Sequence, residues 1–183
     1  MKSKYIESYF QLVESQRKVF YGYIDELGEA PWKRPLPEKW SIGESLYHLM
    51  LMVRLVRRIS IFYFPIMLPY AHFRSSRPYK TKIHNIYEEY NQMKRRPMKA
   101  PFLLMPPKNL SQKYQFTDVQ ELLTIETTKL KEKVINIDER VTGQIRYPDP
   151  IAYYPNVIQS IQLLAIHEQH HFDLMKKYNG NKR

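Results

Sequence analysis

The stretch Ile166-His167-Glu168-Gln169-His170-His171-Phe172, near the carboxyl end of a 183-residue chain, places two histidines four residues apart. On a helix, residues four apart lie on one face about one turn from each other, so His167 and His171 can bind a single ion. Their face continues through four positions that are mostly apolar: Ser160, Leu164, Leu174 and Tyr178. Two buried neutral imidazoles usually need a partner, and a divalent metal is a common one. The alternative is a pair of core histidines that hydrogen-bond to backbone or water.

Long stretches with apolar residues at helical spacing surround this motif. The first runs over residues 4–27 and is followed by Gly28, which suits a helix end. The second begins at the capping box of Ser41 and Glu44, runs to about Phe62, and is apolar nearly all round, so we expect it deep in the fold.

Two further helices are predicted in the carboxyl-terminal half. One begins at a capping box formed by Thr117 and Gln120 and runs to about Ile137. The last contains the histidine motif and runs over residues 155–178, with Pro155 in its first turn. Asn179-Gly180 then ends it.

Residues 64–114 are the least regular part of the chain. They hold seven of the thirteen prolines: Pro65, Pro69, Pro78, Pro97, Pro101, Pro106 and Pro107. We expect loops around one helix at 82–94, followed by an extended apolar segment at 98–107 that packs over the core. The sequence therefore predicts a single all-α domain over 1–183, an antiparallel four-helix bundle with a loop-rich insertion between helices 2 and 3.

The composition limits the classes of function. Apolar residues make up 43% of the chain, as in ordinary globular proteins. With no cysteine, the chain can form no disulfide and has no thiolate ligand or nucleophile. The apolar run 59–68 is too short to span a bilayer. We therefore expect a soluble cytoplasmic protein that does not associate with membranes.

The net charge of +11 is concentrated in one region. Residues 71–115 contain ten Lys and Arg against only Glu88 and Glu89. Such a region can bind nucleic acid. However, no glycine-bearing aromatic strand motif or zinc-finger spacing accompanies it, so we expect a solvated face rather than a nucleic-acid site at 74–113.

A third metal ligand is expected from another helix, because bundles build metal sites from facing helices. We assign it to His48, since its helix is the most buried. His72 and His84 lie in the loop-rich region, and His170 points about 100° away from His171.

Three neutral imidazoles leave the full metal charge and at least one open position, as in catalytic rather than structural sites. Such an ion lowers the pKa of bound water or binds a thiolate or oxyanion. Zinc, nickel, iron and manganese all accept imidazole, and the sequence does not choose among them.

The catalytic residues are left open. His167-Glu168-Gln169-His170-His171 matches the H-E-x-x-H helix of metalloproteases, in which Glu is the general base. Only twelve residues follow, without the G-x-x-H continuation, so a peptidase is the weaker interpretation. Glu168 and Glu44 are the candidate carboxylates, although we expect Glu168 to face outward and Glu44 to serve the capping box.

Three segments resemble a known family in the same order along the chain. They are Trp40-Ser41-Ile42-Gly43-Glu44-Ser45-Leu46-Tyr47-His48-Leu49, Ala100-Pro101-Phe102-Leu103-Leu104 and Ala165-Ile166-His167-Glu168-Gln169-His170-His171. Together they resemble DinB-like proteins, the damage-inducible four-helix bundle family that includes YfiT-like proposed metal hydrolases. The resemblance covers nearly the whole chain.

This resemblance implies a divalent ion on His48, His167 and His171 and frequent homodimers. It also implies activities such as transfer of low-molecular-weight thiols, for example bacillithiol, or metal-dependent hydrolysis. The chain departs from the family at Leu174, where a glutamine is often found. If that glutamine orients a ligand or substrate, the chemistry here differs.

Three functional hypotheses remain. The leading one is a metal-dependent enzyme that activates water or a small thiol for attack on a small-molecule electrophile. The second is a non-catalytic metal-binding or stress-response module. The weakest is nucleic-acid binding through residues 74–113, which would fall steeply with salt.

Overall fold

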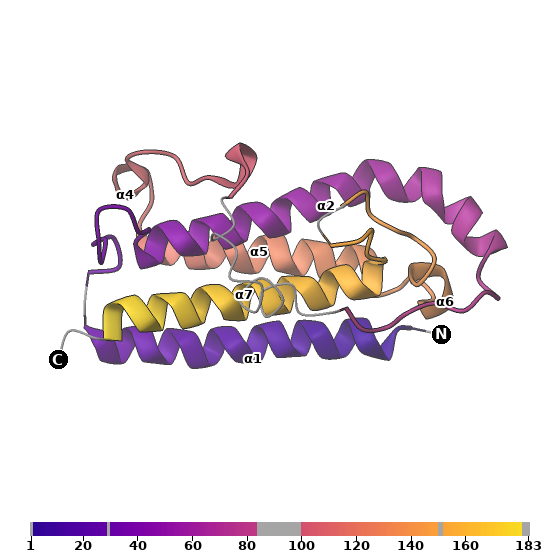
Figure 1. Cartoon of the computed structure of the whole chain (residues 1–183), viewed down its shortest axis with the longest axis horizontal. Coiled ribbons are helices and arrows are strands. Elements are labelled where there is room, and N and C mark those ends of the chain that lie inside the picture. The colour runs from indigo at the N-terminus through magenta and orange to yellow at the C-terminus, as the bar shows by residue number, and fades with distance from the viewer. Residues whose placement is uncertain (1, 29, 84–99, 150–151, 181–183) are drawn as a thin grey trace.

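The computed structural model describes residues 2–28, 30–83, 100–149 and 152–180. Its long helices are α1 (Lys4–Leu27), α2 (Ile42–Phe73), α5 (Phe116–Val134) and α7 (Val157–Gly180), which lie side by side along the long axis (Figure 1). The short elements are η1 (Phe102–Leu104), α4 (Leu110–Lys113) and α6 (Glu139–Thr142). Over the described ranges, β structure is limited to two isolated bridges. The all-α prediction is confirmed.

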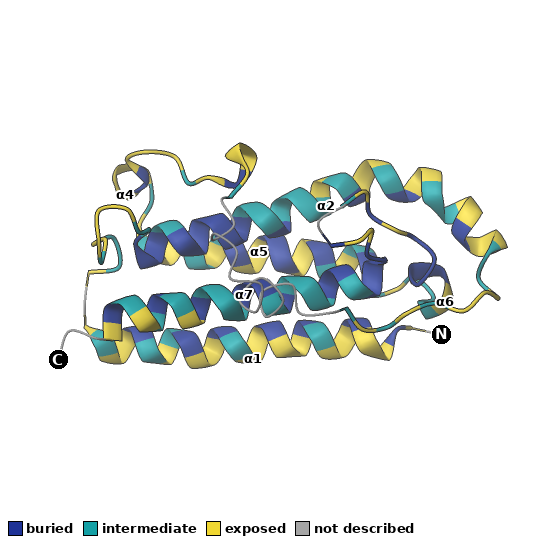
Figure 2. Ribbon diagram, viewed as in Figure 1, coloured by how far each residue is buried: buried dark blue, intermediate teal, exposed yellow. Residues whose placement is uncertain are grey.

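The inner faces of the long helices are buried and their outer faces exposed, as Figure 2 shows most clearly for α1. None of the helices in the described part of the chain combines the length and the apolar content needed to cross a bilayer.

Helix α1 has the predicted bounds. The Ser3 hydroxyl accepts a hydrogen bond from the Ile6 amide at its start. Gly28 follows its end in the left-handed region, with φ of 62°, which glycine adopts without strain. Its buried stripe recurs at helical spacing: Ile6, Phe10, Val13, Arg17, Phe20 and Ile24. One member of that stripe is charged, which matters for the site described below.

Helix α2 is longer than predicted. The Ser41–Glu44 capping box begins it as expected, but the helix continues through Pro65 and Pro69 to Phe73. Both prolines are exposed and lie four residues apart on one side of the helix, where water can satisfy the carbonyl groups that lose their donors. The far part of α2 bends and extends beyond the neighbouring helices (Figure 1), as prolines inside a helix favour. The prediction of an irregular chain from Phe64 onward was therefore wrong for ten residues.

The caps of the two later helices also differ from the prediction. Helix α5 begins at Phe116, and the Asp118 carboxylate accepts a hydrogen bond from the Gln115 amide at 2.8 Å. Helix α7 begins after Asn156, whose side chain accepts from the Gln159 amide at 2.9 Å, while the Gln159 side chain accepts from the Asn156 amide at 3.1 Å. This reciprocal pair is a capping box that sequence reasoning missed.

The directions of the helices differ from a fully antiparallel bundle, first in the pair α2 and α5. The Tyr47 ring lies 5.7 Å from the Tyr114 ring, next to the start of α5. Further along both helices, the Arg57 side chain donates to the Glu126 carboxylate at 2.6 Å. Residue numbers rise together along the contact, so α2 and α5 run parallel.

Helices α1 and α7 are also parallel. Arg17 pairs with Glu168 at one level, and Phe20 stacks on Phe172 at the next, with ring centroids 4.1 Å apart. The chain reaches this arrangement because the long connection between α2 and α5 brings it back to the end at which α2 began (Figure 1).

The described start of that connection runs along the first turns of α7. The Asn156 amide group donates to the carbonyl oxygens of Lys80 and Gly143. The Gln159 side chain donates to the Lys82 carbonyl, and the Ile83 amide donates to the Gln162 side chain. Most of the helix predicted at 82–94 and the basic cluster at 94–96 lie outside the described residues.

Candidate metal centre

The three predicted metal ligands come together in the bundle. His48 lies in the second turn of α2, while His167 and His171 lie one turn apart on α7. His48 and His167 are buried, with 3% and 5% of their surface exposed, and His171 is half-buried. The cluster therefore joins two helices whose candidate ligands are more than a hundred residues apart in sequence.

The ring nitrogens of these side chains converge. The Nε2 atom of His167 lies 3.3 Å from Nε2 of His48 and 2.9 Å from Nε2 of His171. One ligand nitrogen from each of the three lies within 4.8 Å of the others. In a tetrahedral site with metal–nitrogen bonds of about 2.0–2.1 Å, neighbouring ligand nitrogens lie about 3.3 Å apart. The spacing thus suits three ligands of one ion.

A hydrogen bond at Nδ1 of His48 determines which of its two ring nitrogens carries the proton. Its Nδ1 atom lies 2.7 Å from the carbonyl oxygen of Leu104. Because a carbonyl only accepts, Nδ1 carries the proton, and Nε2 of the neutral ring presents a lone pair to His167. A neutral His167 has one ring proton and can donate it to only one of its two close neighbours. A cation among the three Nε2 atoms would satisfy all of them, so the donor set fits a divalent metal.

Burial lowers the pKa of all three histidines. The pKa of His167 falls to about 3, because burial is reinforced by the nearby His48 and His170. Burial also lowers the pKa of His171 well below its ordinary value, and the surrounding histidines add to the effect. For His48, burial outweighs the opposing hydrogen bond to Leu104. All three rings are therefore neutral near pH 7, which is the form that binds metals.

The remaining described histidines stand outside this group. The ring of His170 lies 5.6 Å from that of His171, and burial lowers its pKa while Asp173 opposes that shift. His72 is exposed near the end of α2. His84 lies outside the described residues. The ring of Trp40 packs on His48, with centroids 5.0 Å apart.

Glu168 is buried, so the expectation that it faces outward was wrong. Only 2% of its surface is exposed. Its two carboxylate oxygens accept from Nε and Nη2 of Arg17 at 2.6 and 2.8 Å, and the same Nη2 donates to the Thr127 hydroxyl at 2.9 Å. Burial raises the pKa of Glu168, and Arg17 opposes that shift.

The direction of Glu168 also bears on the H-E-x-x-H pattern. In a metalloprotease, the glutamate faces the ion, whereas here both of its oxygens are bound by Arg17 of α1. Sequence reasoning missed Arg17, although one signal was available. It is a charged residue within the apolar stripe of α1, and such a residue usually needs a buried partner.

Glu44 has the structural role expected of it. Its carboxylate accepts from the Ser41 amide at 2.8 Å, which completes the capping box of α2. It also accepts from Nε of Arg34 at 2.9 Å. Hydrogen bonds from Arg34 and Ser41 lower the pKa of Glu44 although burial raises it. Both oxygens of Glu44 accept from Arg34, as both oxygens of Glu168 accept from Arg17.

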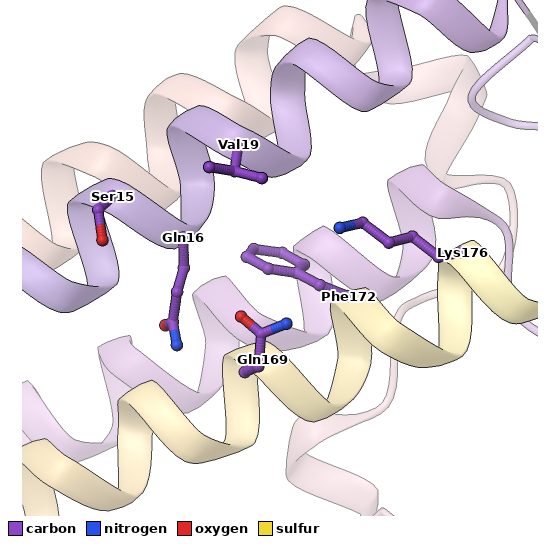
Figure 3. Close-up of a pocket in the computed structure, with 6 residues that line it drawn as sticks. All are labelled: Ser15, Gln16, Val19, Gln169, Phe172 and Lys176. Carbon is purple, nitrogen blue, oxygen red and sulfur yellow. The ribbon is translucent and has the colours of Figure 1, made fainter.

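A shallow groove of about 160 Å³ lies between α1 and α7 (Figure 3). It is lined by Ser15, Gln16, Val19, Gln169, Phe172 and Lys176. Gln169 lies about 200° around α7 from His167. The groove is therefore on another side of the helix and is separate from the histidine cluster.

Comparison with known proteins gives one match. A family model described as the DinB superfamily matches residues 12–175, which include all three histidines and most of the bundle. No curated protein and no solved structure matches the chain.

Proposed function

The chain belongs to the DinB superfamily, and from this premise we propose that it is a metal-dependent enzyme acting on a small-molecule electrophile. His48, His167 and His171 would hold a divalent ion, whether zinc, nickel, iron or manganese. When bound, the ion supplies a Lewis acid with an open position, which activates water for hydrolysis or a low-molecular-weight thiol for S-transfer. The convergence of three Nε2 atoms from two helices is the observation that carries this proposal.

The residues of the chain supply binding and orientation. The buried, neutral rings provide lone pairs without first losing protons, and the half-exposed His171 leaves a route for a small molecule to reach the centre. In S-transfer, the thiol sulfur forms a bond to the electrophilic carbon, the leaving group departs with its electron pair, and the thiol proton passes to solvent.

Elemental analysis of protein purified without added metal tests the first part of the proposal. We expect about one equivalent of metal in the wild type and in His170→Ala, the matched control on the same helix. His171→Ala should lose the metal and keep its helical content. Wild-type protein that binds none of the four metals after reconstitution would contradict the proposal.

The enzyme and the non-catalytic module are separated by a reaction screen. Reconstituted protein is incubated with small thiols and a panel of electrophiles, and loss of free thiol and release of hydrolysis products are followed. The enzyme predicts turnover that His171→Ala abolishes. Metal binding without turnover, or collapse of the fold when the metal is removed, favours the metal-binding or stress-response module.

Nucleic-acid binding through residues 74–113 is a weaker alternative that rests on charge alone. It predicts binding whose affinity falls steeply with salt concentration. A filter-binding assay with mixed-sequence DNA and RNA at low salt, showing no retention, would dismiss it.

The proposal also includes a cellular location and an oligomeric state for the protein. The sequence contains no cysteine, which fits a reducing compartment, and we keep the cytoplasm as the proposed location.

We also propose a homodimer formed through the far half of α2. There, Phe62, Ile66 and Phe73 are 76%, 73% and 83% exposed on one face, and no Asp, Glu, Lys or Arg lies between Ser60 and Arg74. Such a stripe can pair with its own copy across a two-fold axis without opposing like charges.

A further inference from the structure

The end of the long connection between α2 and α5 returns to the bundle at His48. Sequence analysis predicted an apolar segment packed over the core at 98–107, but over its described residues 100–107 a single large apolar side chain is buried. Leu104 is 4% exposed, whereas Phe102, Leu103 and Met105 are 87%, 74% and 49% exposed. Leu104 is therefore the side chain by which the described part of this turn is buried in the protein.

The turn is closed by its own backbone. The Leu104 amide donates to the Pro101 carbonyl at 2.9 Å, and the Met105 amide donates to the Phe102 carbonyl at 3.1 Å. These two bonds form the short 3-10 helix η1 and orient its last peptide group. The Leu104 carbonyl then accepts from Nδ1 of His48 at 2.7 Å.

We propose that residues 101–105 form a His48 clip, in which Leu104 is a positioning residue for the metal centre. Its side chain holds the turn on the bundle, and its carbonyl keeps the His48 proton on Nδ1. Nε2 is thereby kept free and aimed at the other two histidines. The role in metal binding rests on the function proposed above, whereas the role in fixing the tautomer does not.

The clip assigns a role at the metal centre to the part of the connection that follows the gap in the described residues at 84–99. Hydrogen bonds from the second ring nitrogen of a metal-binding histidine to carbonyl groups fix its tautomer and raise its basicity. Here the acceptor lies 56 residues away in sequence and belongs to no long helix. The connection therefore completes the centre from outside the bundle.

The first test is the tautomer of His48 in metal-free protein, read by ¹⁵N NMR of the ring nitrogens. In the wild type, Nδ1 should be protonated and Nε2 unprotonated. Leu104→Ala removes the buried side chain, so the turn should detach and His48 should show exchange between tautomers. Leu103→Ala, at the exposed neighbouring position, is the matched control, and Leu104→Met should restore the wild-type spectrum.

The second test is zinc affinity, measured by competition with a chelating dye. Loss of such a hydrogen-bond partner typically weakens metal binding about 10–100-fold. We expect this loss in Leu104→Ala and wild-type affinity in Leu103→Ala and Leu104→Met. Circular dichroism shows whether each variant keeps its helices.

The two measurements distinguish the possible failures. Wild-type protein that binds none of the four metals but has His48 protonated on Nδ1 would overturn the proposed function and leave the clip's effect on the tautomer standing. Wild-type His48 protonated on Nε2, which needs no variant to observe, would overturn the clip. Equal zinc affinity in Leu104→Ala and the wild type would also overturn it as a positioning element.

Discussion

Arg17 and Glu168 form a buried ion pair that joins the first and last helices. Their side chains are 7% and 3% exposed, and the guanidinium also reaches Thr127 of α5. Removing one partner leaves a buried charge without its counter-ion, which typically costs about 3–5 kcal/mol. Replacing both partners with apolar residues of similar size can be nearly neutral.

A double-mutant cycle tests this pair. We expect Arg17→Met and Glu168→Leu each to lower the free energy of unfolding by about 3–5 kcal/mol, and the double variant to lose less than either single variant. Urea unfolding of metal-free protein measures the three values. Additive losses would show that the two side chains do not act as a pair.

Some residues of the site could be predicted from the sequence, and others could not. His167 and His171 were predictable because helical spacing places them together, and His48 because its helix is the most apolar. The Leu104 carbonyl was not predictable, since a backbone acceptor has no residue type that marks it. Arg17 was visible as a charge in an apolar stripe, but its partner depends on which helix packs beside α1.

At the scale of single elements, glycine controls how closely the loop before α2 approaches its first turn. The ring of Trp32 lies over Gly43, where an added Cβ would come within 2.5 Å of the ring. The Gly43 amide also donates to the Pro31 carbonyl at 2.9 Å. Any side chain at this position must displace Trp32, a rigid aromatic group.

Gly43 in α2 and Gly22 in α1 make a matched pair for a test. Gly43→Ala should lower stability by about 1–3 kcal/mol, because it overpacks the contact with Trp32. Gly22→Ala, where nothing lies within 4 Å of an added Cβ, should raise stability by about 0.5–1 kcal/mol through helix propensity. Thermal unfolding of the two variants gives the signs, and a stabilising Gly43→Ala would contradict the described packing.

The helices themselves were predicted best where local signals agree. Helix α1 has a cap at each end and a buried stripe at helical spacing along its whole length, and its predicted bounds are confirmed. Helix α2 runs past Pro65 because exposed prolines cost less than buried ones, and exposure is a property of the folded chain. The start of α7 was placed at Pro155, since proline is a stronger sequence signal than the Asn156–Gln159 pair.

For the whole molecule, the number of long helices was predictable but their directions were not. The spacing of apolar residues identifies a helix, but it does not indicate whether a neighbouring helix runs parallel or antiparallel to it. The long connection after α2 is the physical reason for the parallel pairs, because it is long enough to bring the chain back from the end of α2 to the level at which α2 began. A short loop would have forced α2 and α5 to be antiparallel.

The proposed homodimer is tested at this scale. Ile66→Glu places a charge in the exposed stripe of α2, so it should convert a dimer to a monomer while the fold is kept. Phe102→Glu, at an exposed apolar position outside the stripe, should remain dimeric. Sedimentation velocity measures the mass of each, and a monomeric wild type would refute the dimer.

Helix α2 carries His48 near one end and Ile66 near the other. At about 1.5 Å per residue, the path between them is about 27 Å, well beyond the Debye length of about 8 Å at physiological ionic strength. Substitutions at one end are thus electrostatically silent at the other. Charge substitutions can therefore be used to engineer the proposed dimer contact and the histidine cluster independently.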